Sequence, residues 1–186
     1  MLENKKNVLF DMDGLLIDSE ALGIKMWEKV FANHNEPFNP EAAYKTIGSN
    51  GLAAQEMLEK ITGNRYYFTR FRDDKIKETR KYLETNPMPV KKGAHELLTY
   101  LKENGYTLVL TSSTFEPDVL FSLKSAGLDQ YFDKFVCGDH VTRAKPNPEI
   151  FNKAIELYNL KKEETFILED SRNGIIAADA AGIDVI

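Results

Sequence analysis

The sequence VLFDMDG, residues 8–14, joins an apolar run to two closely spaced carboxylates. The apolar residues 8–10 predict a buried strand, and Gly14 predicts that the strand has ended. Asp11 and Asp13 lie between them, although Asp has a poor strand propensity and a buried carboxylate is costly without a partner. Two such groups at the end of a strand indicate a bound cation or a reaction that uses them.

Short apolar runs alternate with helical patterns elsewhere in the chain, which predicts a parallel sheet with helices on its faces. Glycine follows three of the predicted helices, where a left-handed C-terminal cap favours a residue without a side chain. We therefore predict a doubly wound α/β core. Its strands are expected at residues 7–11, 107–111, 134–137, 165–168 and 184–186, and its helices at 96–104, 117–126, 148–158 and 173–181.

Residues 17–88 interrupt this alternation, because they show helical patterns and no convincing buried strand. Two apolar stripes at helical spacing occur there, and the charged and aromatic residues 65–83 predict one long helix. We therefore predict an inserted all-helical cap domain over 17–88. The core would then comprise residues 1–16 and 89–186.

The bulk properties exclude several classes of protein. The chain has 186 residues and a net charge of −5, which argues against nucleic-acid binding. No apolar run approaches the length of a membrane span, so we expect no membrane association. The single cysteine, Cys137, cannot form an internal disulfide and is interpreted as core filler. We expect a cytoplasmic protein, because a single cysteine suits a reducing compartment, and we expect a monomer.

Polar residues follow the predicted strands at the edge where open parallel sheets bind ligands. The second strand leads into the hydroxyl-rich segment 111–114, which contains Ser112 and Ser113, and the fourth is followed by Glu169 and Asp170. Lys145 lies on a proline-rich turn between the third and fourth strands. Taken singly, the serines could cap the next helix, and the carboxylates could favour a helix N-terminus.

Together these groups fit a phosphoryl-transfer site. Oxygen ligands from Asp11, Asp170 and Glu169 suit Mg²⁺, which also binds phosphate oxygens. Lys145 and the metal would offset the repulsion between an anionic nucleophile and an anionic substrate. Ser112 and nearby backbone amides would hold the remaining phosphate oxygens. Carboxylate nucleophiles that form an aspartyl-phosphate are an established route for this chemistry.

Four stretches follow one another along the chain: DMDGLLIDSE (11–20), LTSST (110–114), AKPNPEIF (144–151) and LEDSRNG (168–174). They resemble, in order, the four motifs of the haloacid dehalogenase superfamily. The position of the insert is similar to that in the branch with a helical cap after the first motif, which includes β-phosphoglucomutase and many sugar-phosphate phosphatases. The resemblance covers nearly the whole chain and implies a Rossmann-like core.

The resemblance implies a role for each matching residue. Asp11 would be the nucleophile, and Asp13 would be the acid and base, with its backbone carbonyl on magnesium and Ser19 orienting its side chain. Ser112 and Lys145 would bind the transferring phosphoryl group. The remaining expected residues are Ser113 and Asn50 as substrate contacts, and Glu169 and Asp170, which with Asp11 and Asp13 complete the metal site.

The aspartate at position 13 resembles the pattern of the phosphatases and phosphomutases of the superfamily, because the dehalogenases lack this second carboxylate. Gly23 stands where the mutase has a histidine, and the cap loop 47–51 offers no arginine for a second phosphate. We therefore expect a Mg²⁺-dependent phosphatase of a small phosphorylated metabolite, such as a sugar phosphate. A β-phosphoglucomutase-like isomerase stays the alternative, since another cap arginine (65, 70 or 72) could substitute. A phosphonate hydrolase and an inactive phospho-ligand binder are more distant readings.

The last three residues, 184–186, begin what resembles a fifth strand. Relatives usually continue for about thirty residues, enough for a further turn and helix. We expect either a truncated chain or a sheet edge that is finished less fully.

Overall fold

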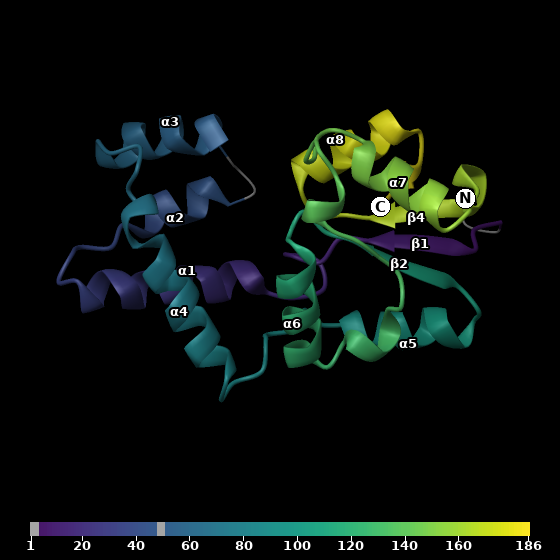
Figure 1. The fold of residues 1–186 in the computed structure, drawn as a ribbon, viewed down its shortest axis with the longest axis horizontal. Coiled ribbons are helices and arrows are strands. Elements are labelled where there is room, and N and C mark those ends of the chain that lie inside the picture. The colour runs from purple at the N-terminus through teal and green to yellow at the C-terminus, as the bar shows by residue number, and fades with distance from the viewer. Residues whose placement is uncertain (1–3, 48–50) are drawn as a thin grey trace. The chain divides into compact units, whose positions relative to one another are not determined.

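The computed structural model describes residues 4–47 and 51–186, with the side chains of 51–53 excepted. The chain divides into two compact units. The core unit comprises Met1–Asp18 and Met88–Ile186, and the helical unit comprises Ser19–Pro87. Figure 1 shows the elements of both units along the chain.

The core unit contains a parallel sheet of five strands in the order β3-β2-β1-β4-β5. All four residues of the central strand β1 are buried, as expected for a strand with neighbours on both sides and helices on both faces. Strand order reverses between β1 and β4, which is where open α/β sheets bind ligands. The strands are β1 (Asn7–Phe10), β2 (Thr107–Thr111), β3 (Phe135–Val136), β4 (Thr165–Leu168) and β5 (Asp184–Val185).

Helices cover both faces of this sheet. In Figure 1, α5 and α6 lie on one side of the strands, and α7 and α8 lie on the other. On the latter side, Leu9 and Ile167 of the sheet pack in one buried cluster with Phe151 and Ala178. This arrangement confirms the predicted doubly wound α/β core. The helices are α5 (Ala94–Glu103), α6 (Glu116–Ala126), α7 (Glu149–Leu157) and α8 (Arg172–Ala181), with 3₁₀ turns η2 (Asp129–Tyr131), η3 (Gly138–His140) and η4 (Lys162–Glu164).

In the described part of the helical unit, all of the assigned elements are helices. A cluster of aromatic rings holds it together around Phe31, which is fully buried and contacts the rings of Tyr67, Phe68 and Phe71. The helices are α1 (Ser19–Asn33), α2 (Pro40–Thr46), α3 (Gly51–Thr62), η1 (Thr69–Phe71) and α4 (Arg72–Leu83).

The prediction of one helix over 65–83 is wrong in its first part, since α4 begins at Arg72. Tyr67 is buried, and its hydroxyl donates to the carbonyl of Pro37 and accepts the amide of Asn39. Phe68 and Phe71 both face Phe31 across a 3₁₀ turn, in which residues three apart are eclipsed. Tertiary contacts of these aromatic side chains therefore override the helical pattern.

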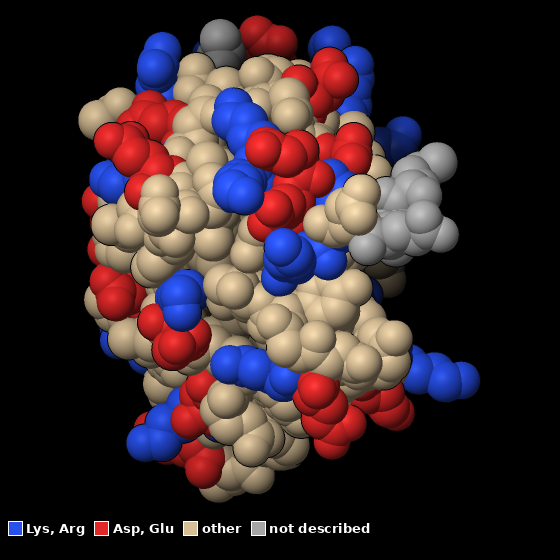
Figure 2. Space-filling model, turned by 90° about the vertical axis from the view of Figure 1, so that its right-hand side faces the viewer, with Lys and Arg blue, Asp and Glu red and all other residues tan. Residues whose placement is uncertain are grey.

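The surface carries both signs of charge. Figure 2 shows acidic and basic side chains interspersed on one face. Among the helices that the structure describes, none has the length and apolar character required to cross a bilayer.

Cys137 is fully buried at the end of β3 and is expected to be chemically inert. Burial raises the pKa of its thiol to about 12, and Glu116 and Asp139 add to the effect. Because the thiolate is the reactive form, the native protein should not react with a disulfide reagent such as DTNB at pH 8. Denaturant should release the one thiol of the chain. Stoichiometric labelling of the native protein would contradict this.

Candidate active site

Three neighbouring strands end in polar residues at the same edge of the core sheet. Ser112 follows β2, Asp11 follows β1 and Glu169 follows β4. The strands are parallel and in the order β2-β1-β4, so their carboxyl ends meet. The backbone amide of Asp11 still donates to the carbonyl of Leu168, 3.0 Å away, which continues the ladder one residue beyond β1.

Lys145 ties these strand ends together. Its Nζ donates to Asp11 Oδ1 and Glu169 Oε2, each at 2.7 Å, and to the carbonyl of Thr111 at 3.1 Å. An ammonium group has three hydrogens, so these contacts use all of them. Lys145, Asp11 and Glu169 are each less than one-tenth exposed. One buried cation thus joins β1, β2 and β4.

Burial and the neighbouring charges shift the pKa values of the groups in this cluster. Burial raises the pKa of Asp11 to about 7, against the opposing effect of Lys145. Burial by itself lowers the pKa of Lys145, but Asp11 and Glu169 outweigh it and leave that pKa above its usual value. Burial also raises the pKa of Asp170, and Glu169 adds to the increase.

The loop that carries Lys145 is fastened by Glu149, in the first turn of α7. The Glu149 carboxylate accepts the amides of Thr142 at 2.7 Å and Arg143 at 3.1 Å. At the other end of the loop, the Glu149 amide donates to Asn147 Oδ1 at 3.1 Å. These bonds close residues 142–149 into a compact turn, which fixes the direction from which Lys145 enters the sheet edge.

Asp11, Glu169 and Asp170 form a set of carboxylates whose ligand oxygens all lie within 4.8 Å of one another. Lys145 compensates one of the three negative charges when all are ionised, which leaves two unbalanced. All the donors are hard oxygen atoms, the type that Mg²⁺ and Ca²⁺ prefer. The set therefore fits a divalent cation in both charge and chemistry.

Two glycines make room for these carboxylates. A Cβ on Gly14, which has a φ of +84°, would lie 2.2 Å from Asp170 Oδ2. A Cβ on Gly174 would lie 1.9 Å from Glu169 Cδ. Glu169 Oε1 also accepts the hydroxyl of Ser171 at 2.7 Å. The glycines of the DMDG and SRNG stretches are thus explained by the close approach of acidic side chains.

Asp13 faces the turn that follows β2. Its Oδ2 accepts the hydroxyl of Thr114 at 2.9 Å and lies 3.5 Å from Ser112 Oγ. Ser112 is fully buried, whereas Ser113 is exposed. Sequence reasoning missed Thr114. The hydroxyl-rich string 111–114 carried the signal, but only the shape of the turn determines which hydroxyl reaches Asp13.

Several residues expected at the site lie in the helical unit or outside the described residues. Asn50 is among the residues that the structure does not describe, and Ser19 begins α1.

A Cβ at Gly23 would meet only Lys75 Nζ, at 4.0 Å, so packing does not dictate the glycine there. Among the candidate arginines, Arg65 pairs with Glu59 and Arg70 pairs with Glu36.

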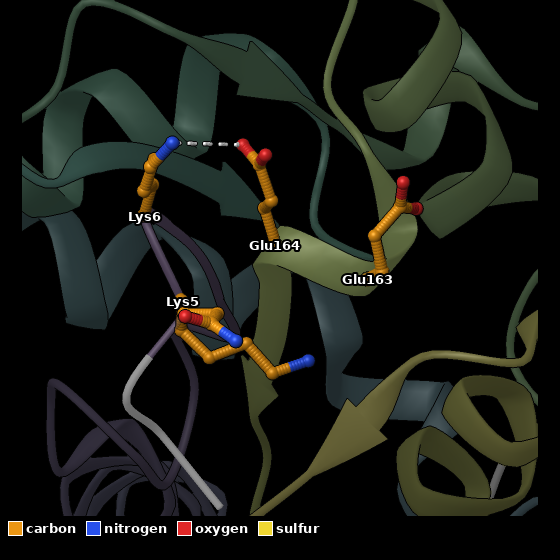
Figure 3. Close-up of a pocket in the computed structure, with 5 residues that line it drawn as sticks. Lys5, Lys6, Glu163 and Glu164 are labelled. Carbon is orange, nitrogen blue, oxygen red and sulfur yellow. Dashed lines mark ion pairs between the residues drawn. The ribbon is translucent and has the colours of Figure 1, made fainter.

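A separate cleft lies at the opposite edge of the sheet. Figure 3 shows Lys5 and Lys6 beside Glu163 and Glu164, with Lys6 and Glu164 paired at 3.6 Å. Lys6 directly precedes β1 and Glu164 directly precedes β4, so this cleft is at the amino ends of the strands. It is therefore distinct from the cluster around Lys145.

Residues 8–186 match the family model of the haloacid dehalogenase-like hydrolases, and the chain belongs to this family. The phosphorylated carbohydrates phosphatase of Thermotoga maritima is 32% identical over 183 residues, which are 96% of this chain and 82% of that protein. The pyrophosphatase PpaX of Bacillus mycoides is 29% identical over 188 residues, covering 96% and 81% of the two chains.

Solved structures agree with this assignment. The crystal structure of a β-phosphoglucomutase-like protein from Thermotoga maritima has a TM-score of 0.79 at 28% identity and covers 97% of this chain and 83% of that one. CbbY from Rhodobacter sphaeroides, in complex with phosphate, has the same fold, with a TM-score of 0.76 at 23% identity over 97% of this chain and 84% of that one. The predicted family is confirmed, and the chain is a phosphoric monoester hydrolase of it.

Gly174→Ala should disturb the acidic cluster, because the added Cβ would collide with Glu169. We expect weaker Mg²⁺ binding by isothermal titration calorimetry and a lower melting temperature. Gly23→Ala is a matched control within α1, since its Cβ meets only a flexible lysine tip. The control should keep metal binding and gain about 0.5–1 kcal/mol of stability from its helix propensity. Equal metal affinity in the two variants would contradict the steric argument.

Metal binding should depend on pH between about 6 and 8. Burial raises the pKa of Asp11 to about 7, so folding favours the neutral carboxyl. The free energy of unfolding is therefore highest, as far as Asp11 is concerned, at low pH, and this part of it is lost as the pH rises through about 7. A metal ion requires the carboxylate, so the increase in melting temperature caused by Mg²⁺ should be larger at pH 8 than at pH 6. In Asp11→Asn this difference should largely vanish. A pH-independent shift in the wild-type protein would contradict the prediction.

Proposed function

We propose that the chain is a Mg²⁺-dependent phosphatase that hydrolyses a small phosphorylated metabolite through an aspartyl-phosphate on Asp11. The observation that supports this most is the contact of Lys145 with both Asp11 and Glu169 beside a second aspartate, Asp13. A binding protein has no need of that second carboxylate. A phosphatase that uses a carboxylate nucleophile needs a separate acid and base.

In the first step, a carboxylate oxygen of Asp11 attacks the phosphorus atom. The bond from phosphorus to the ester oxygen breaks, and Asp13 gives its proton to that leaving oxygen. Lys145 keeps Asp11 in place through its Oδ1 contact and contributes positive charge next to the incoming phosphoryl group. Ser112, buried at the end of β2, would bind a phosphoryl oxygen.

In the second step, Asp13 takes a proton from water as the water oxygen attacks the phosphorus atom. The bond between phosphorus and Asp11 then breaks, which releases inorganic phosphate and restores the carboxylate. Asp13 ends the cycle protonated, ready for the next substrate. One residue thus acts as acid and then as base, and the protons balance over the two steps.

Asp11, Glu169 and Asp170 would hold the magnesium ion, together with the backbone carbonyl of Asp13. When bound, the ion would neutralise part of the charge on the transferring phosphoryl group. Lys145 complements it, because a buried ammonium paired with two carboxylates keeps its charge. The two unbalanced negative charges of the acidic cluster support the need for a metal.

The relatives support a small metabolite as the substrate. One acts, by its name, on phosphorylated carbohydrates, and another on pyrophosphate. The likeness to a β-phosphoglucomutase-like structure keeps an isomerase as the second candidate. Two of the three candidate arginines, Arg65 and Arg70, pair with glutamates inside the helical unit, which favours hydrolysis because a mutase must bind a second phosphate; Arg72 stays a candidate for that role. The products distinguish them, since a mutase interconverts sugar phosphates with little net phosphate release.

Asp11→Asn should abolish phosphate release from a sugar phosphate in the presence of Mg²⁺, because the amide is a poor nucleophile. Asp13→Asn should lower kcat by about 10²–10⁴-fold, the usual contribution of general acid–base catalysis, with a small change in KM. A malachite-green assay of released phosphate measures both. Wild-type turnover in Asp11→Asn would refute the assignment of Asp11 as the nucleophile. An increased KM with an unchanged kcat in Asp13→Asn would show that Asp13 only binds the substrate.

A further inference from the structure

The 3₁₀ turn η3 touches the turn that follows β2. The backbone amide of Gly138 donates to the carbonyl of Thr114 at 2.9 Å. A Cβ on Gly138 would lie 2.1 Å from the carbonyl oxygen of Ser113, so only glycine permits this approach. The two turns are therefore joined through their backbones, directly beside the hydroxyls that face Asp13.

Side chains add a second connection between the same turns. Asp139 Oδ1 accepts the backbone amide of Glu116, 3.0 Å away, at the first residue of α6. The carboxylate of Glu116 in turn contacts His140 Nε2 at 2.9 Å. Each turn thus contributes both backbone and side-chain groups to the contact. We call residues 137–140 the η3 clamp.

His140 completes the η3 clamp through the tautomer of its ring. The amide of Cys137 donates to His140 Nδ1 at 3.1 Å, so Nδ1 carries a lone pair. A neutral imidazole has one N–H, which must then be on Nε2 and is donated to Glu116. Glu116, Asp139 and His140 have the spacing of a metal site, but the ring offers no free lone pair to a metal. The trio instead holds the two turns together.

The η3 clamp acts on Thr114, whose polar atoms all have partners. Its carbonyl accepts the Gly138 amide, and its own amide donates to Ser112 Oγ at 3.1 Å. Its hydroxyl donates to Asp13 Oδ2 at 2.9 Å. Backbone groups fixed on both sides hold the Cα–Cβ bond of Thr114 in place, and in the rotamer it adopts the hydroxyl reaches Asp13. This contact sets the orientation of the Asp13 carboxylate.

We propose that Thr114 is a positioning residue for Asp13 and that the η3 clamp, through Gly138, Asp139 and His140, holds Thr114 in place. The inference rests on the proposed function, because it assumes that Asp13 is the acid and base. Since Oδ2 accepts the Thr114 hydroxyl, the proton that Asp13 gives and takes is carried on Oδ1. Thr114 itself does not exchange protons with the substrate.

This role predicts a dependence on the leaving group. An alkyl phosphate needs its leaving oxygen protonated, whereas p-nitrophenyl phosphate releases p-nitrophenolate, a stable anion that needs little help from an acid. The value of kcat/KM reports the steps up to transfer of the phosphoryl group to Asp11. Misorientation of Asp13 should therefore lower kcat/KM for glycerol phosphate much more than for the aryl ester.

The test compares Thr114→Val, which keeps the shape and removes the donor, with Thr114→Ser, which keeps the donor. For Thr114→Val we expect about a thirtyfold loss of kcat/KM on glycerol phosphate and about threefold on p-nitrophenyl phosphate, which reflects a lost hydrogen bond to a charged group. Thr114→Ser should stay within about threefold of the wild-type protein on both esters. Circular dichroism and thermal unfolding check that each variant is folded.

A second pair of variants tests the η3 clamp at an exposed residue, where folding is least at risk. Asp139→Ala removes the acceptor of the Glu116 amide, and Asp139→Asn keeps an acceptor oxygen at the same place. Asp139→Ala should lower kcat/KM for glycerol phosphate about fivefold relative to the aryl ester, and Asp139→Asn should restore most of that loss.

The outcomes separate this inference from the proposed function. Phosphate release by the wild-type protein together with equal losses on both esters in Thr114→Val would overturn the positioning role alone. Asp139→Asn and Asp139→Ala behaving alike would overturn the part assigned to the η3 clamp. Failure of the wild-type protein to release phosphate from either ester would overturn the proposed function, and this inference with it.

Discussion

The contact of Lys145 with Asp11 and Glu169 is the interaction on which the rest of the site depends. A buried carboxylate is costly alone, and this edge of the sheet holds two of them, Asp11 and Glu169, beside an exposed third, Asp170. One ammonium group, with all three hydrogens used, joins the ends of three adjacent strands. The sheet order supplies the geometry, because β2, β1 and β4 are neighbours. At this switch point of the sheet, Lys145 thereby lowers the free-energy cost of burying carboxylates.

The surrounding sequence is constrained by this cluster. Gly14 and Gly174 leave space for Asp170 and Glu169, where any Cβ would collide with a carboxylate. Gly138 plays the same part for the backbone of the turn after β2. Glycine is thus used at these positions for close approach, which explains why short motifs with fixed spacing carry so much information about this fold.

Much of the fold could be predicted from the sequence, since apolar runs and glycine caps are local signals. The family followed from four motifs in order. Residues 65–83 were predicted wrongly, because the aromatic contacts of Phe68 and Phe71 are tertiary and leave no periodic trace. Thr114 was missed for a similar reason, since Ser112, Ser113 and Thr114 are equivalent as sequence and differ only in direction. The roles given to Asp11 and Asp13 stay predictions, as does that of Asn50, which lies outside the described residues.

The central claim is that the substrate's phosphoryl group is transferred to Asp11. Acid quenching during turnover of a ³²P-labelled substrate, followed by borohydride reduction, converts an aspartyl-phosphate into homoserine, which mass spectrometry locates in the digested chain. The account predicts acid-stable label on the protein and homoserine at position 11 alone. Rapid turnover with no label on the protein, or with homoserine at a different position, would contradict it.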